Sequence, residues 1–475
     1  MEQKSIDFLF FPKSVAFVGI SSDPSNPLRD MFLKPMRNID FKGPLYLINP
    51  KGGDIEGIQV YPSLESVPGQ VDFVIATLPS NYSLQLIEEC IKKGVKAVHF
   101  FTAGFSETGN KDEIELEKKL AKKAREGGVR IVGPNSMGVY CPKGGISYWA
   151  DFPKTPGNVG YISQSGGNSI HLVQMASARG IHFSKVVSYG NACDLNECDY
   201  IEYLADDPDT EIIAVYIEGV REGKRFIDIL TKAAKKKPVI LLKGGVSEAG
   251  IRAVASHTGS LSGSNSTWDA LCNQLGVIRV NSLEELTDML VIFHFMTVPI
   301  GRNVGVVGIG GGASVLSTDE CERNNLYVPP LSKEISDKIM EFTPHVGNII
   351  KNPIDSQLMF RDPGLFVETV RIVSDWEEID LIIALLMSTD VFPSFGETSM
   401  YGLLVDTMLN SCKVSSKPIA VMIQPGIRPE MTKEAFEAQQ KFVSMGFPVF
   451  HSVSHAANAV NKFINFWRWK EKRKI

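Results

Sequence analysis

The sequence has no surplus of basic residues. Its 49 lysines and arginines are outnumbered by 54 aspartates and glutamates, which gives a formal net charge of -5. A protein that binds nucleic acid needs a basic surface to neutralise phosphates, so this composition argues against a nucleic-acid partner. The one basic stretch, Trp467–Lys474, is interpreted as a solvated helix end.

Long apolar runs and paired cysteines are also missing. Apolar runs such as Leu381–Met387 have the length of a strand, far below the ~20 residues that a membrane-spanning helix needs. The seven cysteines are scattered, and the closest pair, Cys193 and Cys198, lacks a second pair to complete a zinc site. An odd number of cysteines, with no apolar leader, indicates a reducing compartment. We therefore expect a cytoplasmic protein with no membrane span and no metal site of its own.

Short β-branched runs are present along nearly the whole chain, and they alternate with amphipathic stretches. This alternation is typical of βαβ units, which form parallel sheets covered by helices on both faces. A chain of 475 residues exceeds one ordinary core, and the rhythm restarts twice after breaks rich in glycine and proline. The sequence predicts an α/β fold of three doubly wound, Rossmann- or flavodoxin-like domains with mainly parallel sheets, at residues 1–147, 148–298 and 299–475. The predicted strands are Val15–Val18, Leu45–Ile48, Phe73–Leu78, Val98–Phe101, Arg130–Val132, Val159–Ile162, Lys185–Val187, Ile212–Ile217, Val239–Leu242, Val304–Val307, Ile379–Met387 and Pro418–Ile423, and the predicted helices include Ser83–Lys93 and Glu113–Arg125.

An internal sequence similarity, called here the internal echo, links the predicted second and third domains. The segment Asn158–Ser169 aligns with Asn303–Ser314, and each is predicted to form a buried strand, a small-residue loop and a helix start. Glycines let such a loop approach a ligand closely, and the helix start offers free N–H groups at the positive end of its dipole. One such loop could be an ordinary tight turn, but two matching loops favour anion binding. The predicted phosphate-binding residues are Ser165, Gly166 and Gly167 in the first loop and Gly311, Gly312 and Ala313 in the second.

Small or hydrogen-bonding residues follow four strands of the first domain. The carboxyl ends of parallel strands meet at one edge of a sheet, where nucleotide-like ligands bind. Plain turns are the alternative, because the first loop does not match the GxGxxG fingerprint. The candidate cofactor-binding residues at this edge are Gly19, Ser21, Ser22, Lys51, Leu78, Pro79, Thr102, Ala103 and Gly104.

His257 lies in the segment Ala255–Ser264, which is dominated by serine, glycine and threonine and is predicted to be an ordered loop. Such a loop lets an imidazole swing and a phosphate approach, although a lone histidine is more often structural. Glu218 directly follows the predicted strand Ile212–Ile217. A carboxylate there could fix the tautomer of a nucleophilic imidazole, or it could be a solvated strand end.

These pieces, in this order, resemble the NDP-forming acyl-CoA synthetase family, which includes ADP-forming acetyl-CoA synthetase and succinyl-CoA synthetase. The resemblance covers nearly the whole chain. The segments that carry it are Val15–Gly19, Asn49–Lys51, Gly133–Asn135, Gly160–Gly167, Tyr189–Asn191, Glu202–Pro208, Ile217–Gly219, Glu248–Gly250, Ser256–Ser260, Gly276–Glu285 and Asn352–Asp355. Two features depart from the family pattern: Ser136 stands where relatives commonly have cysteine, and the first loop lacks a glycine near Asn26–Leu28.

The resemblance implies a CoA-binding first domain, with Asn135 among its contacts, and a second domain in which His257 carries phosphate and Glu218 orients it. It implies interconversion of acyl-CoA, ADP and phosphate with a carboxylic acid, ATP and CoA, through an acyl phosphate. ATP, ADP and Mg²⁺ are expected on a separate ATP-grasp β subunit, in an α2β2 assembly. A non-catalytic CoA or acyl-CoA sensor of the same fold is the alternative. Acetate, an aryl acid or a dicarboxylic acid remain open as substrates.

Overall fold

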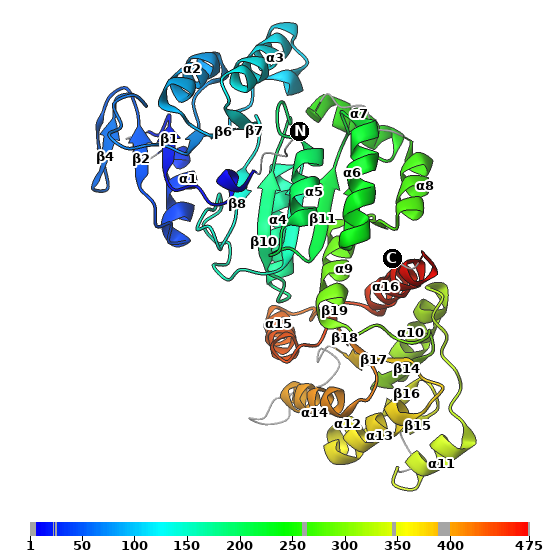
Figure 1. Cartoon of the computed structure of the whole chain (residues 1–475). Helices are drawn as coiled ribbons and strands as arrows, with labels where there is room; N and C mark the ends of the chain where they lie inside the picture. The colour runs from blue at the N-terminus through cyan, green and yellow to red at the C-terminus, as the bar shows by residue number, and fades with distance from the viewer. Residues whose placement is uncertain are drawn as a thin grey trace. The chain divides into compact units, whose positions relative to one another are not determined.

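The computed structural model describes residues 6–21, 23, 26–258, 264–343, 348–387 and 400–473. The chain packs as two units, one made of Met1–Ser177 with His182–Leu286 and the other of Ala178–Ile181 with Thr287–Ile475. Three mainly parallel sheets form the framework, two in the first unit and one in the second (Figure 1). Among the described helices, none is long and apolar enough to cross a membrane.

The first sheet has seven strands in the order β3-β4-β2-β1-β5-β6-β7. Only the β3–β4 hairpin at one edge is antiparallel. Its apolar core includes Val74, Val98 and Ile131, and α2 and α3 pack side by side against the sheet (Figure 1). The strands are β1 (Val15–Val18), β2 (Leu45–Ile48), β3 (Gly53–Ile55), β4 (Ile58–Tyr61), β5 (Phe73–Ala76), β6 (Ala97–Phe100) and β7 (Arg130–Val132), and the helices are η1 (Asp7–Leu9), α1 (Pro27–Asn38), η2 (Ser80–Tyr82), α2 (Ser83–Lys93), η3 (Ser106–Thr108) and α3 (Lys111–Glu126).

The second sheet has the order β13-β12-β11-β9-β10-β8, in which only β8 is antiparallel. Apart from β8, this is the doubly wound order 2-1-3-4-5. The strands are β8 (Gly138–Tyr140), β9 (Val159–Ser163), β10 (Phe183–Ser188), β11 (Ile212–Ile217), β12 (Val239–Lys243) and β13 (Ile278–Val280), and the helices are α4 (Gly166–Ser177), α5 (Glu197–Asp206), α6 (Gly223–Lys236), α7 (Glu248–Thr258), α8 (Asn265–Leu275) and α9 (Leu283–Phe295).

The third sheet repeats the 2-1-3-4-5 order as β16-β14-β17-β18-β19, with β15 added antiparallel at the edge. Its core packs around Phe366, Leu404 and Phe442. The strands are β14 (Val304–Gly308), β15 (Asn348–Ile350), β16 (Ile354–Ser356), β17 (Leu381–Leu386), β18 (Ile419–Ile423) and β19 (Val449–Phe450), and the helices are α10 (Gly311–Arg323), α11 (Lys333–Met340), α12 (Leu358–Arg361), α13 (Pro363–Asp375), α14 (Met400–Val414), α15 (Pro429–Ser444) and α16 (Val453–Arg473).

The predicted fold class is confirmed, and every predicted strand is present within one or two residues of its expected ends. The domain boundaries at residues 147 and 298 stay predictions, although β8 already belongs to the second sheet. The loop predicted over Ala255–Ser264 is wrong at its start, because α7 continues to Thr258. Ser247 Oγ accepts a hydrogen bond from Gly250 N at 3.1 Å, which stabilises the start of this helix.

Candidate functional site

The three glycine-containing loops follow the central strand of each sheet. β1 lies between β2 and β5, β9 between β10 and β11, and β14 between β16 and β17. The connection that follows each central strand and the one that follows its neighbour β5, β11 or β17 run in opposite directions along the sheet, so they cover opposite faces. In open α/β sheets the ligand binds at such a point, outside the carboxyl ends of the strands.

The candidate cofactor residues of the first sheet form a connected row. At Gly19, φ is +93°, and a Cβ would lie only 3.0 Å from Leu78 N, so the first loop lies directly against the end of β5. Thr102 Oγ1 donates to Leu78 O at 2.7 Å, and Asn135 N donates to Thr102 O at 3.0 Å. The ends of four strands are thus tied together along one edge.

The remaining cofactor candidates flank this row. Lys51 is exposed, and its backbone N donates to Asn49 Oδ1 at 3.0 Å. Ser21 Oγ accepts from Asp23 N at 3.1 Å, whereas Ser22 lies outside the described residues. Pro79 precedes η2, and Ala103 and Gly104 follow Thr102.

The segments Gly133–Asn135 and Tyr189–Asn191 meet at the boundary between the two sheets of the first unit. Asn191 N donates to Pro134 O at 3.0 Å. A Cβ at Gly190 would lie 2.2 Å from Asn135 O, so only glycine permits this approach.

A cavity of about 360 Å³ opens beside this junction. It brings together Thr102, Ala103 and Asn135 from the cofactor candidates with Ser165, Gly166 and Gly167 from the phosphate candidates. Neither Gly19 nor Lys51 lines it. The complete lining is Phe101, Thr102, Ala103, Asn135, Ser136, Met137, Gln164, Ser165, Gly166, Gly167, Gly190 and Asn191.

The start of α4 supplies one part of the cavity wall. Ser165 Oγ accepts from Asn168 N at 3.3 Å and Ser163 Oγ accepts from Ser165 N at 3.2 Å, which fixes the loop. The N–H groups of Gly166 and Gly167 have no acceptor within the described part of the chain. A Cβ at Gly167 would meet nothing within 4 Å. These amides are therefore available to an anion at the positive end of the helix.

Glu218 is buried, with 5% of its surface exposed, so it is not a solvated strand end. Tyr216 Oη donates to Glu218 Oε1 at 3.1 Å. Lys243, also buried, donates from Nζ to Glu218 O at 2.8 Å, and burial lowers the pKa of this lysine to about 8. Glu218 therefore lies in a polar cluster at the ends of β11 and β12.

His257 belongs to the last turn of α7, and the rest of its small-residue segment, residues 259–263, lies outside the described residues. Helix α7 contacts η3, which directly follows the candidate residues Thr102–Gly104. The histidine-bearing helix is thus brought to the cofactor edge of the first sheet.

The start of α10 lies in the second unit, and a carboxylate borders it. Asp355, on β16, accepts a hydrogen bond from Gly310 N through Oδ1 at 2.7 Å. A Cβ at Gly311 would lie 3.2 Å from Asp355 Oδ2, and one at Gly312 would meet nothing within 4 Å. The predicted phosphate contacts of Gly311, Gly312 and Ala313 stay predictions.

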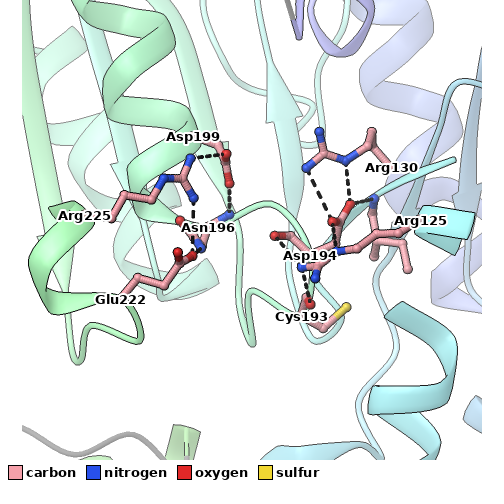
Figure 2. A network of polar contacts seen from close by, with 9 residues as sticks. Arg125, Arg130, Cys193, Asp194, Asn196, Asp199, Glu222 and Arg225 are labelled. Atoms are coloured by element: carbon pink, nitrogen blue, oxygen red, sulfur yellow. Dashed lines mark hydrogen bonds and ion pairs between the residues drawn. The ribbon is translucent and has the colours of Figure 1, made fainter. Parts of the chain in front are cut away.

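Asp194 joins the two sheets of the first unit close to this site. Its carboxylate accepts from Arg125 Nε and Arg130 Nε, both at 2.8 Å, and from Ile131 N at 2.9 Å. Figure 2 shows these contacts beside a second group in which Asn196 caps α5. Because Asp194 follows Tyr189–Asn191 by a few residues, the network holds that segment against the first sheet.

Several residues of the cavity wall have no predicted role. Gln164 and Tyr189–Asn191 stand within motifs of the sequence, and Ser136 stands where the family pattern has cysteine. The sequence signal for these residues is that they are polar positions within the motifs. Their place in one cavity wall depends on the fold, which brings two strand ends together.

Two family models match the N-terminal three-fifths of the chain, roughly residues 13–293. Residues 13–142 match a CoA binding domain, and residues 156–293 match the flavodoxin-like domain of succinyl-CoA ligase.

Similar proteins are known along almost the entire length. The α subunit of acetate–CoA ligase (ADP-forming) II from Pyrococcus furiosus is 35% identical over 437 residues, which cover 91% of this chain and 93% of that subunit. The 4-hydroxybutyrate–CoA ligase (ADP-forming) of Nitrosopumilus maritimus is 35% identical over 349 residues, covering 72% of this chain and 49% of that enzyme. Among solved structures, the dinucleotide-forming acetyl-coenzyme A synthetase 1 of Ca. Korarchaeum cryptofilum, in complex with phosphate and ADP, superimposes with a TM-score of 0.81 at 30% identity and covers 98% of both chains.

Proposed function

Because this chain belongs to the ADP-forming acyl-CoA synthetase family, whose members are acid–thiol ligases, we propose that it is the α subunit that converts acyl-CoA and phosphate into acyl phosphate and carries the phosphoryl group on His257. Residues 1–147 bind CoA, residues 148–298 carry His257, and residues 299–475 complete the ligase. A separate ATP-grasp β subunit, in an α2β2 assembly, holds ADP or ATP with Mg²⁺. The physiological acid is a small carboxylic acid.

The main support for this proposal is the 360 Å³ cavity. The same cavity is lined by cofactor candidates of the first sheet and by the start of α4. Its size suits the reacting end of an acyl-CoA rather than the whole cofactor. The remainder of CoA would follow the row of strand ends from Asn135 to Gly19 and Lys51. The amides of Gly166 and Gly167 supply donors for phosphate.

The reaction proceeds in three balanced steps. A phosphate oxygen attacks the thioester carbonyl, forming a C–O bond, and CoA leaves with the C–S electron pair and takes a proton. An imidazole nitrogen of His257 then attacks phosphorus, and the P–O bond to the acyl group breaks to release the carboxylate. ADP finally accepts the phosphoryl group from His257. Positioning and charge stabilisation supply most of the rate in such transfers, and Glu218 stabilises the positively charged imidazole.

The test is phosphorylation of the purified chain by acyl-CoA and labelled phosphate. We expect an acid-labile, base-stable label together with release of CoA, and no label from ATP and Mg²⁺ until an ATP-grasp subunit is added. His257→Asn should abolish the label while CoA still binds. His171→Asn, an exposed histidine on α4, is the matched control and should label normally.

Labelling that survives in His257→Asn would refute the assignment of the phosphorylated residue. Phosphorylation of the isolated chain by ATP would refute the division of labour between subunits. Glu218→Gln keeps the shape but removes a charge, and by analogy with other preorganised polar groups it should slow turnover roughly 30- to 1000-fold. Turnover within twofold of wild type would leave Glu218 with a purely structural role.

A further inference from the structure

Gln164 lies between the phosphate candidates and Glu218, and the mechanism above does not use it. The side chain is 6% exposed and lines the cavity next to Ser165. Its Oε1 accepts hydrogen bonds from Glu218 N at 2.7 Å and from Gly219 N at 3.1 Å. A single amide therefore links the end of β9 to the end of β11.

These two contacts fix which way the amide faces. Backbone N–H groups can only donate, so the atom facing them must be the oxygen of Gln164 and not its nitrogen. The Nε2 group then points away from Glu218 and Gly219. It donates to no group in the part of the chain that the structure describes. Because Gln164 lines the cavity and its nitrogen is not among the sealed polar atoms that lack a partner, Nε2 is accessible from the cavity, where a ligand can supply the acceptor.

We propose that Gln164 Nε2 donates a hydrogen bond to an oxygen of the phosphate held by the amides of Gly166 and Gly167. This inference rests on the proposed function, and it adds a side-chain donor to a site otherwise built from backbone. This hydrogen bond holds the phosphate during its attack on the thioester. It also holds the phosphoryl group of the acyl phosphate until His257 attacks. Through Oε1 the same residue keeps the backbone of Glu218 in register with that phosphate, so Gln164 is both a catalytic and a positioning residue.

The variant Gln164→Glu separates the two roles of this side chain, accepting hydrogen bonds from the backbone and donating one to phosphate. A carboxylate still accepts from Glu218 N and Gly219 N, but it turns an oxygen instead of an N–H group toward the phosphate. In the full chain assembled with its ATP-grasp subunit, we expect kcat/KM for inorganic phosphate to fall ~100-fold or more, as for loss of one preorganised donor. KM for acyl-CoA and the midpoint of thermal unfolding should stay near wild type.

Two further variants distinguish loss of the hydrogen-bond donor from the effect of an added negative charge and from loss of stability. Gln174→Glu makes the same change at an exposed position on α4, the helix that follows Gln164, and should leave phosphate kinetics unaltered. Gln164→Met keeps the length but has neither donor nor acceptor, so it should lose phosphate turnover and also unfold at a lower temperature.

Phosphate kinetics of Gln164→Glu within threefold of wild type would overturn this inference alone. A lower unfolding midpoint with unchanged phosphate kinetics would likewise assign Gln164 a structural role only. A wild-type complex that makes no ATP from ADP, phosphate and any acyl-CoA would instead refute the proposed function.

Discussion

The starts of α4 and α10 have matching sequences and equivalent places in their sheets, yet their surroundings differ. At α4, the amides of Gly166 and Gly167 face a cavity, and the neighbouring strand end is bound through the neutral amide of Gln164. At α10, the carboxylate of Asp355 accepts directly from Gly310 N. A negative charge therefore borders one of the two loops already.

The difference arises from the strand beside each loop. Asn352 pairs with the backbone of β14 through its side chain, accepting from Val306 N at 2.9 Å and donating to Val304 O at 2.7 Å, and this places Asp355 three residues later against the loop. A glycine loop and a helix start offer the same backbone donors in both units. What they bind is decided by side chains from neighbouring strands.

The largest effect that would separate the two loops is expected from paired aspartates. Gly167→Asp places a carboxylate at the start of α4, where the proposed function puts the phosphate, so we expect kcat/KM for phosphate to fall ~100-fold or more. Gly312→Asp adds a second charge near Asp355, and we expect less than a tenfold loss. Both positions have space for a side chain, so steric effects are matched. Equal losses in steady-state kinetics would show that both helix starts bind the phosphate, as the internal echo predicts.

Low pH should selectively lower the stability of the part of the first unit that surrounds the start of α4. His99 lies behind the cavity wall, with Nε2 2.8 Å from Ser136 O, and burial lowers its pKa to about 4. The unfolded chain binds a proton below the ordinary histidine pKa of ~6.5, whereas the folded chain does not until about pH 4, so stability is lost across this window. The loss attributable to His99 amounts to roughly 3 kcal/mol.

Hydrogen-exchange protection measures this effect locally. From pH 7 to pH 5, amides of β6, the strand that contains His99, should lose protection relative to those of β17 in the second unit. His99→Gln should make the protection of β6 much less dependent on pH. An equal loss of protection in β6 and β17 would argue against His99 as the cause.

The smallest expected effect concerns the carboxylate at α10. Asp355→Asn removes its charge while an amide oxygen can still accept from Gly310 N. A carboxylate at a helix start is worth ~0.3–1 kcal/mol when exposed, so the second unit should unfold a few degrees lower at low salt. The shift should shrink in high salt, which thermal unfolding at two ionic strengths would measure. A shift that is the same at both would indicate lost packing rather than lost charge.

Much of the framework could be predicted because runs of consecutive apolar, β-branched residues must be buried. Strands such as Val15–Val18 and Ile212–Ile217 are found where the sequence places them. The missed strands are short, and some are polar at an edge, such as Gly53–Ile55; the others include β8, β13, β15, β16 and β19. Strands of two to four residues form because a neighbouring strand offers hydrogen bonds, and no local pattern reveals that neighbour.

By itself the sequence determined three mainly parallel sheets, the two glycine loops and a histidine in a run of small residues, because each depends on local composition and periodicity. Tertiary structure decided what those features face. Gln164 reaches Glu218 and Asp355 reaches Gly310 across separations of 54 and 45 residues. The extension of α7 through His257 also depends on its surroundings. Small polar residues can adopt either a helical or a loop conformation, according to the residues that precede and contact them. Strand pairing sets these distances, and it is fixed only when the whole sheet has formed.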